Sequence, residues 1–101
     1  MKYIFWSNGN YLGFIDDSGN LFSRDGLYLG WVEGSLIWGG DDGQFRGQTW
    51  GDKYILRNKY SITPIAKIPR TTPVTPVLPT PPANIAPTIL PVGFVDAFDI
   101  Q

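Results

Sequence analysis

The sequence predicts an all-β domain of four β-hairpins, followed by an extended, proline-rich C-terminal arm. Turn motifs recur every 17 residues at Asn8-Gly9, Asp25-Gly26 and Asp42-Gly43, each between apolar runs of strand length. Composition also divides the chain, because 11 of the 12 glycines lie in residues 1–51 and all nine prolines lie in residues 64–91. We therefore expect a hairpin domain over residues 2–69 and an arm over residues 70–101.

The first three hairpins turn at their Asn-Gly or Asp-Gly pair, since both residue types suit the positive φ angles of a type I′ turn. The fourth period has Lys59-Tyr60 at this position, which lacks that chemistry. This hairpin is therefore degenerate, or it turns at Asn58. Ordinary turn residues connect the hairpins: Asp17-Ser18-Gly19, Glu33-Gly34 and Gly51-Asp52.

Aligning the four periods of 17 residues places apolar side chains in equivalent positions on both sides of each turn. Before the turn, the aligned sets are Ile4, Leu21, Trp38, Ile55 and Phe5, Phe22, Gly39, Leu56. After the turn, they are Tyr11, Tyr28, Phe45, Ile62 and Phe14, Trp31, Gln48, Ile65. Neighbouring residues of a strand face opposite sides, so both faces of the sheet are at least partly covered. The arm is available to cover the second face.

A further aligned set contains Gly13, Gly30 and Gly47, with Pro64 in the fourth period. Glycine inside a strand marks a bulge, a bend or the close approach of another backbone. For hairpins arranged around an axis, we expect this close approach near the axis.

The arm carries Pro73, Pro76, Pro79 and Pro82 at every third residue. Polyproline II has three residues per turn, so these prolines share one edge. Residues 70–76 also match the R-x-x-P-x-x-P pattern of SH3 ligands. Such matches are common in proline-rich stretches, and a stiff connector or an arm packed on its own domain explains them as well. The apolar residues 89–100 should be buried on the hairpins or on another subunit.

Three G-x-x-x-G pairs with an aromatic residue inside each carry a family resemblance: Gly9/Gly13, Gly26/Gly30 and Gly43/Gly47. Over residues 2–69 this pattern resembles the four-fold beta flower domain family. The resemblance implies four hairpins with pseudo-fourfold symmetry, and it implies no activity.

Composition limits the functions that we expect. A chain of 101 residues forms one domain, and its net charge of −1 argues against nucleic-acid binding. It has no cysteine and no histidine, which removes thiol and imidazole chemistry, so we expect no metal and no cofactor. The sequence has no apolar run long enough to cross a membrane. We expect a cytoplasmic protein without membrane partners.

Two carboxylate pairs, Asp16-Asp17 and Asp41-Asp42, are typical of solvated turns. No further ligand or base stands at a recognisable spacing, so we expect a protein that is not an enzyme. An axial pocket lined by two or more close carboxylates would instead favour a carboxylate-based hydrolase.

Trp6 and Trp50 depart from the repeat, because the other periods have mainly small, polar or charged residues at these positions. An exposed tryptophan is a frequent anchor for ligands or partners, so both are candidate binding residues. The alternative is that the apolar end of the arm covers them. The leading hypothesis is a non-catalytic binding or interaction module. The alternative is a structural or assembly protein that forms homo-oligomers through its C-terminal arm.

Overall fold

The computed structural model describes residues 1–98 and has eight β-strands. They are β1 (Lys2–Phe5), β2 (Tyr11–Ile15), β3 (Asn20–Ser23), β4 (Tyr28–Glu33), β5 (Leu36–Gly39), β6 (Phe45–Trp50), β7 (Tyr54–Asn58) and β8 (Phe94–Asp96). Within these residues there is no helix, so the all-β prediction is confirmed. The last residues of the predicted arm, 99–101, lie outside the described part of the chain.

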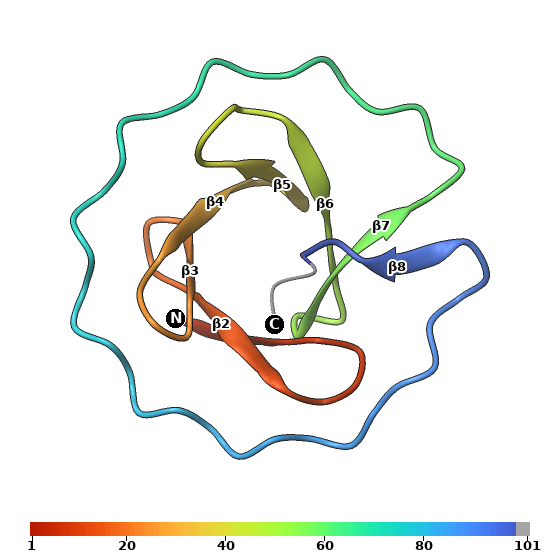
Figure 1. The fold of residues 1–101 in the computed structure, drawn as a ribbon, viewed down its shortest axis with the longest axis horizontal. Helices are drawn as coiled ribbons and strands as arrows, with labels where there is room; N and C mark the ends of the chain where they lie inside the picture. Colours follow the sequence, from red (N-terminus) through yellow and green to blue (C-terminus); the bar gives the residue numbers. More distant parts are fainter. Residues whose placement is uncertain (99–101) are drawn as a thin grey trace.

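The first seven strands form a closed barrel. Each pairs antiparallel with the next, and a parallel pairing of Phe5 with Tyr54 joins β1 to β7. The hairpins splay outward from the barrel axis (Figure 1), and the whole chain forms a disc of 36 × 35 × 23 Å. Closure joins β1 to β7 and so reduces the free sheet edge that would otherwise invite pairing with other chains, while β8 pairs with β7 alone.

The fourth hairpin is split along the chain. Its first strand is β7 and its second strand is β8, with Asn58 opposite Phe94 and Leu56 opposite Asp96. The sequence alignment placed this strand at Ile62 and Ile65, which is wrong, because residues 62–69 form no strand. The chain instead turns away at Asn58, whose side-chain oxygen accepts a hydrogen bond of 3.0 Å from the amide of Tyr60.

Residues 62–92, which we call the belt, run around the outside of the barrel before they reach β8 (Figure 1). The belt passes the hairpin turns in reverse order. The amide of Lys67 donates to the carbonyl of Gly43 at 2.8 Å, and the amide of Ile85 donates to that of Gly9 at 2.9 Å. Between these points, Thr75 and Leu78 lie beside Gly26. The belt and β8 therefore belong to the same folded unit as the strands before residue 70.

The inner edge of the belt covers a ring of aromatic side chains. From residue 71 to 85, the half-buried belt residues are Pro73, Pro76, Pro79, Pro82 and Ile85, at every third position. Beneath the belt, five aromatic residues on the outer side of the barrel are at most 4% exposed: Tyr11, Phe14, Phe22, Trp31 and Trp38. This cover explains why both faces of the strands are apolar.

A second apolar cluster fills the inside of the barrel: Ile4, Leu12, Ile15, Leu21, Leu29, Ile37, Ile55 and Phe98. The alignment made Trp38 the equivalent of Leu21, but in the structure the equivalent residue is Ile37. Leu21 pairs with Gly30, and Ile37 pairs in the same way with Gly47. The connection Gly34-Ser35 is short, since Glu33 pairs directly with Leu36. The following turn is longer by one residue and is closed by a bond from Gly43 to Gly39. The two changes compensate, so the glycine spacing hides them.

The strand glycines allow another backbone to approach closely, as predicted. A Cβ atom on Gly13 would lie 2.0 Å from the carbonyl oxygen of Phe22, and one on Gly30 would lie 1.9 Å from that of Trp38. The neighbour is thus the next hairpin around the barrel. The expectation that the approach occurs at the axis is wrong.

Candidate functional site

Trp50 ends β6 on the outer side of the barrel, beside the split hairpin. Its side chain is 39% exposed, and its ring lies 5.3 Å from that of Phe94 in β8. One repeat earlier, Glu33 is held by the belt residues Lys67 and Arg70. Trp50 instead contacts the returning strand and keeps a free face.

Beyond Phe94, further exposed apolar groups lie where the two ends of the belt meet. Tyr60 is 78% exposed, and its ring lies against Gly93. Ile62 and Val92, which begin and end the belt, are almost fully exposed. We call this set the seam patch: Trp50, Tyr60, Ile62, Val92 and Phe94.

Trp6 lies elsewhere and is half-buried against the inner apolar cluster. Its indole N–H donates a hydrogen bond of 2.6 Å to the carbonyl oxygen of Phe98. The next residue, Ser7, donates from its amide and hydroxyl groups to Asp96, at 3.0 and 2.6 Å. The C-terminal segment therefore covers Trp6, and the two tryptophans singled out from the sequence do not form one site.

A pocket of about 470 Å³ opens where the connections between hairpins meet. Its lining combines aliphatic residues, among them Ile4, Ile15 and Val32, with Asp16, Asp17 and Asp52. This is the kind of pocket that would favour a carboxylate-based hydrolase.

Each of these carboxylates, however, already has a donor. Asp16 accepts from the amides of Ser18 and Asn20 at 2.9 Å, and Asp52 accepts from Lys2 at 3.0 Å. Asp17 accepts from the N-terminal ammonium at 2.6 Å, and this hydrogen bond lowers the pKa of its carboxyl. A general acid needs the opposite shift. The carboxylates of this pocket are therefore arranged as ion pairs and hydrogen-bond acceptors, and this arrangement does not favour a catalytic acid–base pair.

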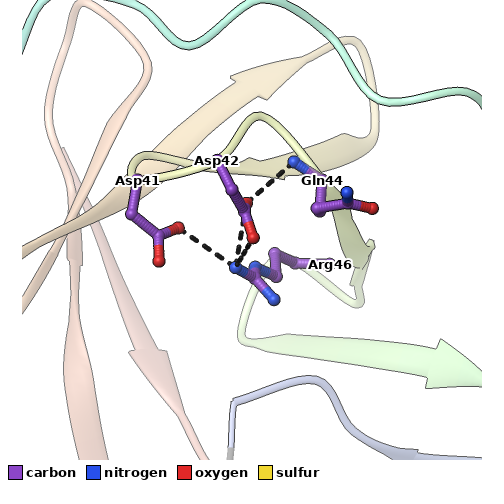
Figure 2. A network of polar contacts seen from close by, with 4 residues as sticks. All are labelled: Asp41, Asp42, Gln44 and Arg46. Atoms are coloured by element: carbon purple, nitrogen blue, oxygen red, sulfur yellow. Dashed lines mark hydrogen bonds and ion pairs between the residues drawn. The ribbon is translucent and has the colours of Figure 1, made fainter.

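The second carboxylate pair neutralises Arg46 on the turn of the third hairpin (Figure 2). Arg46 donates to Asp41 at 3.1 Å and to both oxygens of Asp42 at 3.0 Å, while Asp42 also accepts from the amide of Gln44 at 2.9 Å. The pKa of Asp41 is lowered, chiefly by a backbone hydrogen bond. These contacts stabilise the longer turn. Among residues 1–98, no group of three acidic side chains is placed to hold a metal ion.

Glu33 fastens the start of the belt. Its carboxylate accepts from Lys67 at 2.5 Å, from Arg70 at 2.6 Å and from the indole of Trp31 at 3.0 Å. The guanidinium of Arg70 also lies 4.8 Å from the centre of the Trp31 ring. The hydrogen bond from Lys67, followed by that from Trp31, lowers the pKa of Glu33 to about 2. Arg70, the first residue of the SH3-like motif, is therefore engaged within the chain.

Phe94 was not singled out from the sequence, and Tyr60 was noted as part of the atypical turn Lys59-Tyr60 and not as a binding residue. Phe94 follows Gly93 in the segment Gly93-Phe94-Val95-Asp96-Ala97, which has the spacing of the G-x-x-x-G pairs with alanine as the second small residue. This signal was available, although it lies outside the 17-residue register.

Comparisons with known proteins agree with this architecture. The described chain has no helix of the length and apolar character needed to cross a bilayer. Searches of curated proteins and of solved structures found no match. The model of the family described as 4-fold beta flower protein matches residues 1–95, a range that includes the belt. The chain therefore belongs to the 4-fold beta flower protein family.

Proposed function

We propose that this protein is a non-catalytic interaction module that binds a partner through the seam patch, with Trp50 at its centre. The observation that carries the proposal is the free face of Trp50 beside Phe94, at the split hairpin. Exposed aromatic residues within an apolar patch are typical anchors of binding surfaces. Trp6, the other candidate, has no part in this surface, because its indole N–H is bonded to Phe98.

The proposal treats the first three hairpins as quasi-equivalent units of 17 residues around a pseudo-fourfold axis, with β7 and β8 together as the fourth unit. On such a scaffold, function tends to occur where a unit departs from the others. The split fourth hairpin is the largest departure, which supports the seam as the site.

The proposal also concerns the class of partner. A net charge of −1 argues for a protein or a small molecule as partner and against nucleic acid. The engaged carboxylates of the axial pocket support a role without catalysis. A cytoplasmic location belongs to the same proposal.

NMR on the full-length protein tests the site with a library of small aromatic and aliphatic fragments. Fragments should shift the indole N–H signal of Trp50 and leave that of Trp6 unchanged. Trp50→Ala should abolish this binding, whereas Trp50→Phe, which keeps an aromatic ring, should retain part of it. Fragments that collect in the axial pocket around Asp16, with the Trp50 signal unmoved, would overturn the proposed site.

A further inference from the structure

The outward-facing side of the belt is apolar along its whole length. At every third position stands an aliphatic residue or threonine: Ile62, Ile65, Ile68, Thr71, Val74, Val77, Thr80, Ala83, Ala86, Ile89 and Val92. The isoleucines and valines of this set are 89–97% exposed. We call this set the outer stripe.

The prolines of the belt avoid the outer stripe. Those at 73, 76, 79 and 82 are half-buried against the barrel, whereas all residues of the stripe are exposed. The stripe therefore adds nothing to the packing of its own domain. Aliphatic side chains that are scattered singly on a surface need no explanation, but a continuous series marks an interaction surface.

The stripe is widest at the seam. Elsewhere it is a single row on a convex rim, so a flat partner can touch only a few of its side chains. At the seam, the ring of Tyr60 lies against Gly93, and the amide of Lys59 donates to the carbonyl of Gly93 at 2.8 Å. This closure brings the two ends of the belt together, with Ile62 and Ile65 on one end and Ile89 and Val92 on the other.

The charge distribution indicates what can occupy this surface. No charged residue lies between Arg70 and Asp96, so the C-terminal end of the belt offers nothing that pairs with a charged partner. Beside the other end, Lys59 places one positive charge 5.8 Å from the centre of the Tyr60 ring. Insertion into hydrocarbon is disfavoured as well, because the belt forms no strand or helix and its backbone groups would lose their water. A second apolar surface of the same kind fits, and a net charge of −1 gives little repulsion between copies.

The available area agrees with a pair of copies. The four stripe residues at the seam and Tyr60 are largely exposed and offer roughly 100 Å² of apolar surface each. Trp50 and Phe94 are partly covered and add less, so the patch offers about 600 Å² in all. A standard interface buries about 800 Å² per partner, so this area is that of a weak dimer. A twofold interface uses the same patch on both subunits, so one patch is sufficient.

We infer that two copies of this chain associate across their seams, with the ends of the two outer stripes packed against each other. This inference rests on the proposed function, because Trp50 lies within the interface, and it names the partner as a second copy. The association depends on concentration. In the dimer each belt stays packed on its own barrel, so no arm is exchanged between the copies.

Sedimentation equilibrium of the full chain, from low micromolar to near-millimolar concentration, tests this inference. The mass of the native protein should rise toward twice that of the monomer. The double variant Ile62→Lys/Val92→Lys should remain monomeric. The matched control Val74→Lys/Val77→Lys alters two stripe residues of similar exposure away from the seam and should still dimerise.

Native protein that stays monomeric throughout would overturn the inference, as would equal loss of association in both double variants. Monomeric protein that floats together with neutral phosphatidylcholine vesicles would also overturn the inference, because lipid and not a second copy would then cover the seam. The fragment experiment at Trp50 uses dilute, monomeric protein, so failure of the dimer leaves the proposed function standing.

Discussion

Gly93 occupies in the fourth hairpin the position that Gly9 occupies in the first, with φ angles of +87° and +91°. Each glycine stands four residues before a small residue, which is Gly13 within β2 and Ala97 directly after β8. The fourth hairpin is thus made of two segments that the belt separates in sequence. Removing the later segment should affect the sheet itself.

A chain that ends at Arg70 should therefore fail to fold. It loses β8 and the Phe98 side chain, and it uncovers the aromatic residues that the belt buries. Burying one such side chain contributes about 1.5–3 kcal/mol, so several together match the whole stability of a small domain. Near-ultraviolet circular dichroism of the truncated chain should be featureless. A well-dispersed NMR spectrum of this chain would contradict the prediction.

Gly43→Ala should destabilise the protein more than Gly34→Ala. Both glycines have left-handed φ angles, of +70° and +62°, so alanine costs about 1–2 kcal/mol in either place. At Gly43 the new Cβ atom would lie 1.7 Å from the carbonyl oxygen of Lys67, whereas nothing lies within 4 Å at Gly34. The overlap should add about 1–3 kcal/mol.

Urea unfolding of the two variants measures this difference. Because backbone strain is matched, the excess at Gly43 reports the contact between turn and belt alone. Equal midpoints for the two variants would mean that the belt is not held at this turn.

The Glu33 contacts should make stability depend on pH in the acid range. The pKa of Glu33 is lowered to about 2 in the folded protein, against an ordinary value of 4.5. A group whose pKa falls on folding stabilises the protein above its unfolded pKa, and this contribution is lost as the pH falls through the folded value. Glu33→Gln should therefore melt below the native protein at neutral pH, and the two melting curves should converge between about pH 4.5 and 2. A difference in Tm that stays constant down to pH 2 would contradict the assignment.

The exposure of Trp50 predicts two distinct responses. Iodide should quench the fluorescence of Trp50 and spare Trp31 and Trp38, which are 1% and 4% exposed. Trp50→Ala should remove the quenchable fraction and cost little stability. Trp31→Ala should cost about 3–5 kcal/mol, because it leaves a cavity beneath the belt. Quenching that survives in Trp50→Ala would show that another tryptophan is accessible.

Much of the fold follows from the sequence. Asn8-Gly9 and its two equivalents identify the turns, because each glycine adopts a left-handed φ that few residue types accept. The predicted type I′ geometry is wrong, since Asn8, Asp25 and Asp42 do not have positive φ angles. The one-residue shift that places Ile37 instead of Trp38 in the inner cluster is hidden, because a shorter connection at Gly34-Ser35 cancels the longer turn that follows. The split of the fourth hairpin escapes a search with a fixed period, since the belt separates Lys59 from Gly93.

The site was predicted in part. Trp50 is exposed, as an unusual residue within the repeat indicates, whereas Trp6 is covered by Phe98. Sequence alone does not distinguish the two, because their difference depends on where the belt leaves the barrel and where it returns. The outer stripe has a clear three-residue period, but its exposure becomes evident only once the inner prolines are seen against the barrel.

The order in which the belt passes the hairpins has a consequence for biosynthesis. The first three hairpins are local and can pair as they emerge from the ribosome. β7 can then pair with β6, but its hairpin partner β8 is synthesised only after the whole belt. Closing so long a loop is slow compared with forming a hairpin. During that interval the nascent barrel exposes its outer aromatic residues, so it is a natural client for chaperones that bind exposed apolar chains.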